Sequence, residues 1–229
     1  MMRFAYPFLF IATLLLAVSA SAESKSNPAE APWVAFSGSF GFSGEIGFGL
    51  GADGAETSSA SRANPTAGFV INGGVPLLDH LKVGGQLGFH WLQSESMDRS
   101  NTDRHFAFDF QLLLRPYLTF LNGRLELFAD IIQGLTVIDH QEQRFSTISG
   151  LVIQPEFGNG IAVVPNTFVG WSGQVLVGLE YHFMTMLSAH MKIGYAGWYA
   201  VAKDASNDSI QASVQAHQFA LVFGASYTF

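Results

Sequence analysis

The residues with the clearest capacity for chemistry are charged side chains that stand singly among apolar ones. Arg115 lies within LLLRPYL and Asp130 within LFADIIQ, so neither has a charged neighbour in the chain. A charge removed from water is costly unless an opposite charge accompanies it. Such placement predicts a network of ion pairs or, alternatively, a path along which ions move. The residues assigned to this lumen charge network are Glu45, Lys82, Asp109, Arg115, Glu126, Asp130, Glu180 and Lys192.

The elements that position these charges are indicated by strict alternation. Between residues 34 and 50, bulky apolar residues such as Phe36, Phe40 and Phe48 occupy every second position, with mainly Ser and Gly between them. A period of two is typical of a β-strand. Similar series recur at 67–75, 81–91, 106–114, 125–131, 169–183, 189–199 and 219–229. We therefore predict eight strands, with the charges on the parity opposite to the bulky apolar side chains.

The connections between these strands alternate in length. Those reading PLLDH, LNGR and MTML are short, whereas 52–66, 94–104, 139–166 and 202–213 are long and mostly polar. Short turns at one end and long loops at the other are typical of a transmembrane β-barrel.

Composition indicates that the apolar face of the sheet points outward, toward lipid. Only 13% of residues are charged, against roughly 25% in soluble domains. A soluble eight-stranded barrel such as a lipocalin would have to pack these Phe, Leu and Trp side chains into an interior too narrow for them. Beyond the first two dozen residues no apolar run approaches the roughly 20 residues of a membrane-spanning helix, which argues against a helical membrane protein. The fold predicted is all-β: an eight-stranded antiparallel up-and-down transmembrane β-barrel.

The start of the chain predicts export. Arg3, the apolar run 8–18 and the small residues 20–22 form a signal-peptide pattern, so 1–22 is interpreted as a cleaved signal peptide. Residues 23–32 are polar with two prolines and are expected to form a disordered periplasmic lead before a barrel at 33–229. Removing one base from a net charge of −7 leaves −8, which argues against nucleic-acid binding. The absence of Cys excludes disulfides.

The last residues, LVFGASYTF, continue the alternation to Phe229. Gly224, Tyr227 and Phe229 match the terminal recognition signal of bacterial outer-membrane barrels, although Phe223 stands where that signal usually has a polar residue. Together with the eight strands, this makes 33–229 resemble the small eight-stranded outer-membrane group that includes the OmpA transmembrane domain and OmpW. The resemblance implies the outer membrane of a Gram-negative bacterium, contact with its lipid and lipopolysaccharide, and insertion by the barrel assembly machinery.

The dipeptide Asn122–Gly123 predicts a tight hairpin turn. With these two residues at its centre, Arg115 faces Asp130 across the hairpin, and both point inward. Because eight strands leave little free bore, we favour a polar plug over an ion path.

A group of histidines and aspartates raises the question of enzymatic or metal chemistry. His90, His105, Asp109, Asp139 and His140 lie toward the long-loop end, where a Ser, His and carboxylate set is conceivable, as in lipid A-modifying barrels. The His-x-Ser arrangement of the known deacylase is missing, and so is the H-E-x-x-H metal motif. We expect hydrogen-bonded histidines, with no catalytic residue, metal or cofactor.

The stretch 139–166 contains ISGLVIQPEFGNGIAVVP, which is apolar for a solvated loop. An external hairpin extending its two strands is favoured; the alternatives are a cover over the mouth, an entry for an apolar ligand, or contact with an extracellular partner. The function predicted is an outer-membrane protein with a structural or surface-interaction role, a polar-plugged lumen and four external loops. The alternatives are a small channel for ions or apolar solutes and a lipid A-modifying enzyme.

Overall fold

The computed structural model describes residues 30–52, 55–95, 102–140, 167–203 and 210–229. Within them lie eight strands, which form one closed antiparallel barrel in which each strand pairs with its sequence neighbours and β8 pairs with β1. No helix of the described residues is long and apolar enough to cross a membrane. The strands are β1 (Trp33–Ala52), β2 (Ala55–Leu78), β3 (Leu81–Glu95), β4 (Thr102–Phe120), β5 (Leu125–His140), β6 (Thr167–His182), β7 (Leu187–Lys203) and β8 (Ile210–Thr228). The predicted fold class is confirmed.

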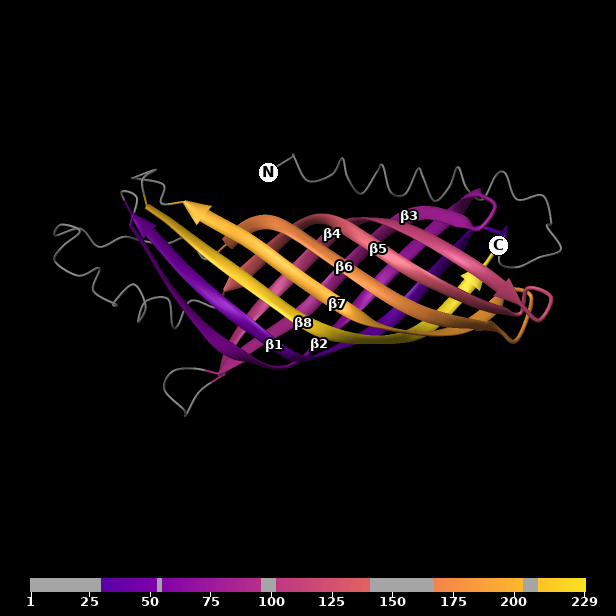
Figure 1. The fold of residues 1–229 in the computed structure, drawn as a ribbon, viewed down its shortest axis with the longest axis horizontal. Coiled ribbons are helices and arrows are strands. Elements are labelled where there is room, and N and C mark those ends of the chain that lie inside the picture. Colours follow the sequence, from indigo (N-terminus) through magenta and orange to yellow (C-terminus); the bar gives the residue numbers. More distant parts are fainter. Residues whose placement is uncertain (1–29, 53–54, 96–101, 141–166, 204–209) are drawn as a thin grey trace.

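The strands are strongly tilted, and the barrel has two unequal ends (Figure 1). The end that carries the C-terminus has the short turns between β2 and β3, β4 and β5, and β6 and β7, and is called the short-turn end. At the opposite, long-loop end, β1, β2, β7 and β8 reach further than the other four strands (Figure 1). The 20 residues of β1 correspond to about 66 Å of strand, twice the 9–11 residues that a membrane crossing needs.

The predicted hairpin between β4 and β5 has the expected register. Asn122 and Gly123 both have positive φ angles, 56° and 81°, as a type I′ turn requires. Thr119 pairs with Glu126 and Tyr117 with Phe128, so the same register sets Arg115 beside Asp130. Their side chains meet inside the barrel.

The two faces of the wall separate as predicted. Phe36 is 60% exposed and Leu112 75% exposed on the outside, whereas Arg115, on the inside, is 1% exposed. The aromatic rings also contact one another across strands, as Phe40 does with Phe223 at 5.3 Å between centroids. An apolar exterior around a charged interior is the arrangement of a barrel surrounded by hydrocarbon.

A β-bulge in β1 overturns one prediction. From Phe42 to Glu45, β1 advances three residues while β8 advances two, and Ser43 takes a positive φ of 51°. One extra residue moves all later side chains of a strand to the opposite face. Glu45 was predicted to point inward, but its side chain is 65% exposed, 3.9 Å from His217. Ile46, predicted to face lipid, is buried in the interior.

The bulge coincides with a change in the surroundings of the barrel. On β8, the outward residues from the short-turn end to Phe219 are largely apolar, whereas His217, Gln215, Ser213 and Gln211 beyond it are polar. The inward residues Ala216, Val214 and Ala212 are apolar. Beyond the bulge the barrel therefore has the polarity of a soluble barrel, which follows if water replaces hydrocarbon at this level.

The predicted connections are longer than the observed ones. Residues 55–66 were predicted to be loop, but they continue β2 and pair with β1 as far as Ala52 and Ala55, and residues 102–104 and 210–213 likewise belong to β4 and β8. Small and polar residues predominate in 55–66, so the alternation that marks the other strands is weak there. The predicted signal peptide and most of the lead (1–29), and the loop segments 96–101, 141–166 and 204–209, lie outside the described residues.

Candidate functional site: the filled lumen

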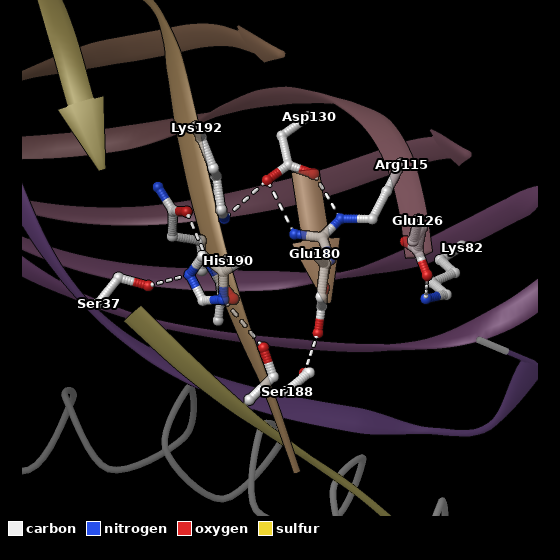
Figure 2. Close-up of polar contacts among 12 residues, drawn as sticks. Ser37, Lys82, Arg115, Glu126, Asp130, Glu180, Ser188, His190 and Lys192 are labelled. Carbon is white, nitrogen blue, oxygen red and sulfur yellow. Dashed lines mark hydrogen bonds and ion pairs between the residues drawn. The ribbon is translucent and has the colours of Figure 1, made fainter. Parts of the chain in front are cut away.

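The third of the lumen nearest the short-turn end contains a compact ionic cluster, shown in Figure 2. Arg115 holds Asp130 with two nitrogens, Nε to Oδ1 at 2.6 Å and Nη2 to Oδ2 at 2.9 Å. Its third nitrogen donates to Glu180 at 3.3 Å. Lys192 donates to Asp130 at 2.8 Å, and Lys82 to Glu126 at 2.7 Å. We call these six residues, contributed by β3 to β7, the plug.

The plug is balanced in charge and closed to solvent. It has three cations and three carboxylates, and every side chain in it is at most 4% exposed. Aromatic rings complete its packing, because the Arg115 guanidinium lies 4.1 Å from the ring centre of Trp33 and 4.0 Å from that of Phe128. An ion pair is stable away from water only with such geometry and further hydrogen bonds. The plug meets these conditions.

A second set of hydrogen bonds, beside the plug, joins β7 to the closing strands β1 and β8. His190 contacts Ser37 through Nε2 at 2.8 Å and Ser226 through Nδ1 at 3.0 Å. Ser188 donates to the free oxygen of Glu180 (Figure 2). These contacts join β1, β7 and β8 where the barrel closes.

Neutral polar side chains form a belt next to the plug, on the side of the long-loop end. Asn72 donates to Gln86, Gln86 to Gln111 at 2.8 Å, and Gln111 to Ser172 at 2.9 Å. On the other side of the lumen Thr66 donates to Gln218 at 2.7 Å. All six are buried, so direct side-chain contacts occupy the middle of the barrel.

A separate polar group surrounds Asp109. Trp198 Nε1 donates to its carboxylate at 2.9 Å, and His90 Nε2 lies 3.3 Å from Oδ2 without hydrogen-bond geometry. Ser39 Oγ lies 3.4 Å from the other ring nitrogen of His90. Gly88 makes room for this group, since a Cβ there would be 2.7 Å from His90 Nε2.

The remaining lumen, toward the long-loop end, has a mainly apolar inner wall, in which His105 is a buried polar residue. We call this part the outer lumen. Its inward side chains are all buried, and many are alanines: Ile46, Leu92, Ala107, Ile138, Phe168, Ala200, Ala202, Ala212, Val214 and Ala216. From the short-turn end to the long-loop end, the interior side chains are therefore first charged, then neutral and polar, and then mainly apolar.

Of the eight predicted network residues, six are brought together in the plug. Asp109 is buried but lies apart from the plug, and Glu45 is outside the barrel. His90 and His105, which the sequence placed toward the long-loop end, are buried, and so are His182 and His190, whereas Asp139 is exposed. The prediction missed Trp33, Phe128 and Trp198, although inward parity identifies each of them. Among the described residues no group of three side chains has the arrangement of a metal site.

The predicted assembly signal lies in the closing strand. Tyr227 and Phe229 point outward, with ring centroids 5.2 Å apart. Gly224 lies against β1, and a Cβ there would be 2.2 Å from the carbonyl oxygen of Phe36. The backbone N of Phe229 donates to Pro32. The regular C-terminus is thus part of the closing seam.

Comparison with known proteins supports the architecture. No protein-family model and no curated protein sequence matches the chain. Among solved structures, the outer membrane protein OprG from Pseudomonas aeruginosa matches with a TM-score of 0.57 and 11% identity, over 89% of this chain and 97% of that one. This chain has the fold of the small outer-membrane β-barrels.

Two further solved barrels match over similar lengths. AlkL in lipid bilayers matches with a TM-score of 0.45 and 16% identity, over 91% of this chain and 94% of that one. Neisserial surface protein A matches with a TM-score of 0.35 and 9% identity, over 85% and 97%. The outer-membrane location predicted for this barrel agrees with its fold and its apolar exterior. A shared barrel fold does not assign a role, which has to come from the residues.

Proposed function

We propose that this chain is a non-conducting outer-membrane barrel whose role is exerted at its external surface. The filled lumen is the observation that carries the proposal. Six charged side chains neutralise one another near the short-turn end, an amide belt crosses the middle, and apolar side chains line the rest. Ions crossing this barrel would have to displace a balanced buried network, which is costly.

The extended strands support a surface role. In barrels of this kind the long loops face the outside of the cell. Beyond the bulge, β1, β2, β7 and β8 extend the barrel wall past its apolar, lipid-facing surface. The outer side of this extension has exposed polar residues such as Gln215. We propose that this extension, together with the loops, is what other molecules meet. The segment 139–166 is proposed as a contact with an unidentified extracellular partner.

Conductance tests the closed lumen. Purified protein in planar bilayers is expected to give no stable openings, and simultaneous replacement of Arg115, Asp130 and Glu180 by alanine is expected to produce them, because it removes the centre of the plug. A matched variant, Glu45→Ala, removes a charge from the outer face and should stay silent. Stable nanosiemens-scale openings in the unaltered protein would contradict the proposal.

Surface presentation is tested by labelling, since the chain has no Cys. Gln215→Cys on intact cells is expected to react with a membrane-impermeant maleimide. Asp79→Cys, in the exposed turn between β2 and β3 at the other end, should react only after the cells are broken. The reverse pattern would place the extension in the periplasm and end the surface proposal.

A second candidate function is a path for apolar solutes, which the apolar outer lumen favours. The small side chains of Ala107, Ala200 and Ala212 line this inner wall beside the bulkier Leu92, Ile138 and Phe168. Uptake of a labelled hydrocarbon into proteoliposomes tests it: uptake reduced by Ala200→Phe but not by Val201→Phe, on the opposite face, would favour this candidate over a purely surface role.

No reaction is assigned to Ser39, His90 and Asp109. In a serine triad the carboxylate orients Nδ1 and the hydroxyl faces Nε2. Here the two partners are exchanged and the serine lies 3.4 Å from the ring. We propose that this set binds rather than catalyses.

A further inference from the structure

Asp109 differs from every other interior acid of the described residues. The three acids of the plug each contact a lysine or arginine. Asp109 has no such partner among the described residues; within 4 Å its one basic neighbour is His90. Its side chain has no exposed surface. A buried carboxylate normally has a fixed cation or a bound metal beside it, so this position lacks a positive charge from the chain.

Two further buried polar atoms around Asp109 have unused hydrogen-bonding capacity. Thr136, which pairs with Asp109 across β4 and β5, is fully buried, and its Oγ1 has no hydrogen-bond partner. His90 Nε2 is likewise buried without one. Such orphaned groups in a native interior call for a partner that completes their bonding, either water or a bound ligand.

All three groups can act as acceptors: His90 lies beside the Asp109 carboxylate, and Thr136 is the cross-strand neighbour of Asp109. With its proton on Nδ1, facing Ser39, His90 presents a lone pair at Nε2 beside Asp109. Thr136 Oγ1 supplies another lone pair. Trp198 already donates to the carboxylate from the opposite side of the lumen and holds it in position.

We propose that Asp109, His90 and Thr136 bind the primary ammonium group of a small amine. An ammonium group has three N–H donors and no acceptor, which matches one carboxylate and two neutral acceptors. Its charge balances Asp109. The alkyl part would extend toward the outer lumen, whose walls have to part to admit it, because Ala107 and Ile138 have no exposed surface in this structure. A carboxylate head is rejected by the charge of Asp109, and a hydroxyl head leaves that charge unbalanced.

The indole N–H of Trp198 is a built-in reporter, because it donates to the proposed site. The experiment uses deuterated, ¹⁵N-labelled protein in lipid nanodiscs at constant pH, with the Trp198 indole signal assigned through Trp198→Phe. Titration with n-butylammonium chloride is expected to shift that signal saturably. Tetramethylammonium chloride, which has the same charge but no N–H donor, should leave it unchanged. The indole signal of Trp33, whose ring packs against Arg115 of the plug, should not move with either salt.

Variants separate the three acceptors. Asp109→Asn keeps an oxygen for Trp198 and is expected to weaken butylammonium binding at least tenfold. Thr136→Val is expected to weaken it by roughly three- to tenfold, the effect of one hydrogen bond. Glu45→Gln, a carboxylate outside the barrel, should bind like the unaltered protein. Heat-dependent migration on gels checks that each variant is folded.

Two outcomes would overturn the site. One is equal butylammonium affinity in the unaltered protein and Asp109→Asn. The other is a Trp198 shift that acidification reproduces and that amine does not affect at constant pH, since protonated His90 would then be the cation of Asp109. Neither outcome bears on the proposed surface role, which depends on conductance and labelling.

Discussion

Replacement of Arg115 by methionine is expected to lower the free energy of unfolding by about 3–5 kcal/mol, the cost of breaking a buried ion pair by removing one partner. Arg115 contacts two acids, donating twice to Asp130 and once to Glu180. Methionine fills a similar volume without charge, so the plug is left with two cations for three carboxylates. Asp130 keeps Lys192 as a partner, whereas Glu180 loses the one ion pair that it makes with the described residues.

The measurement is urea unfolding in lipid vesicles, followed by tryptophan fluorescence and by heat-dependent gel migration. Arg124→Met, in the exposed turn between β4 and β5, makes the same chemical change outside the lumen and should cost less than about 0.5 kcal/mol. Arg115→Lys keeps the charge but loses the bidentate geometry, and should lie between them. Equal costs for Arg115→Met and Arg124→Met would show that the plug does not stabilise the barrel.

Replacement of Phe223 by arginine is expected to cost about 2–4 kcal/mol, the penalty for a cation on the lipid face near the middle of a bilayer. Phe223 is 46% exposed in the middle of the apolar outer face of β8, and its ring packs against Phe40. The same strand offers a matched position. Gln215 has the same outward parity but lies beyond the bulge of β1, so Gln215→Arg should cost at most about 1 kcal/mol.

Both variants are compared in the same vesicle unfolding assay, with Phe223→Leu to separate the loss of ring contact from the added charge. A large cost at both positions would mean that hydrocarbon extends past the bulge. A small cost at both would mean that Phe223 does not face lipid. Only the predicted difference supports a lipid boundary between Phe219 and His217.

Much of the barrel could be predicted because a period of two was repeated eight times. The alternation within each strand identifies the residues that point inward, since successive side chains point to opposite sides. The pairing of Arg115 with Asp130 was predictable as well, because Asn122–Gly123 sets the register of a hairpin whose strands adjoin in sequence. These are local relations.

The position of Glu45 was not predictable in the same way. Its parity matches that of Ser37 and Ser39, which point inward on the same strand, and the residue that reverses it, Ser43, has no side chain that demands a positive φ. The outward polar residues of 211–217 indicate in the sequence where the lipid-facing surface ends. Only the pairing of this segment with β1 shows that the bulge lies at the same level along the barrel. Alternation without the register therefore assigned Glu45 and Ile46 to the wrong faces.

The amino-acid sequence by itself determined the class of fold, the number of strands and, outside the bulge of β1, which side chains meet lipid, because these depend on alternation within single strands and on solvent. Apart from the pair Arg115 and Asp130, tertiary structure alone decided which charges meet. Lys82 with Glu126, Lys192 with Asp130 and Trp198 with Asp109 are contacts between strands that are not neighbours in the sheet, and they form across the lumen. Such contacts depend on the stagger of the closed barrel, which brings distant positions to one height along its axis.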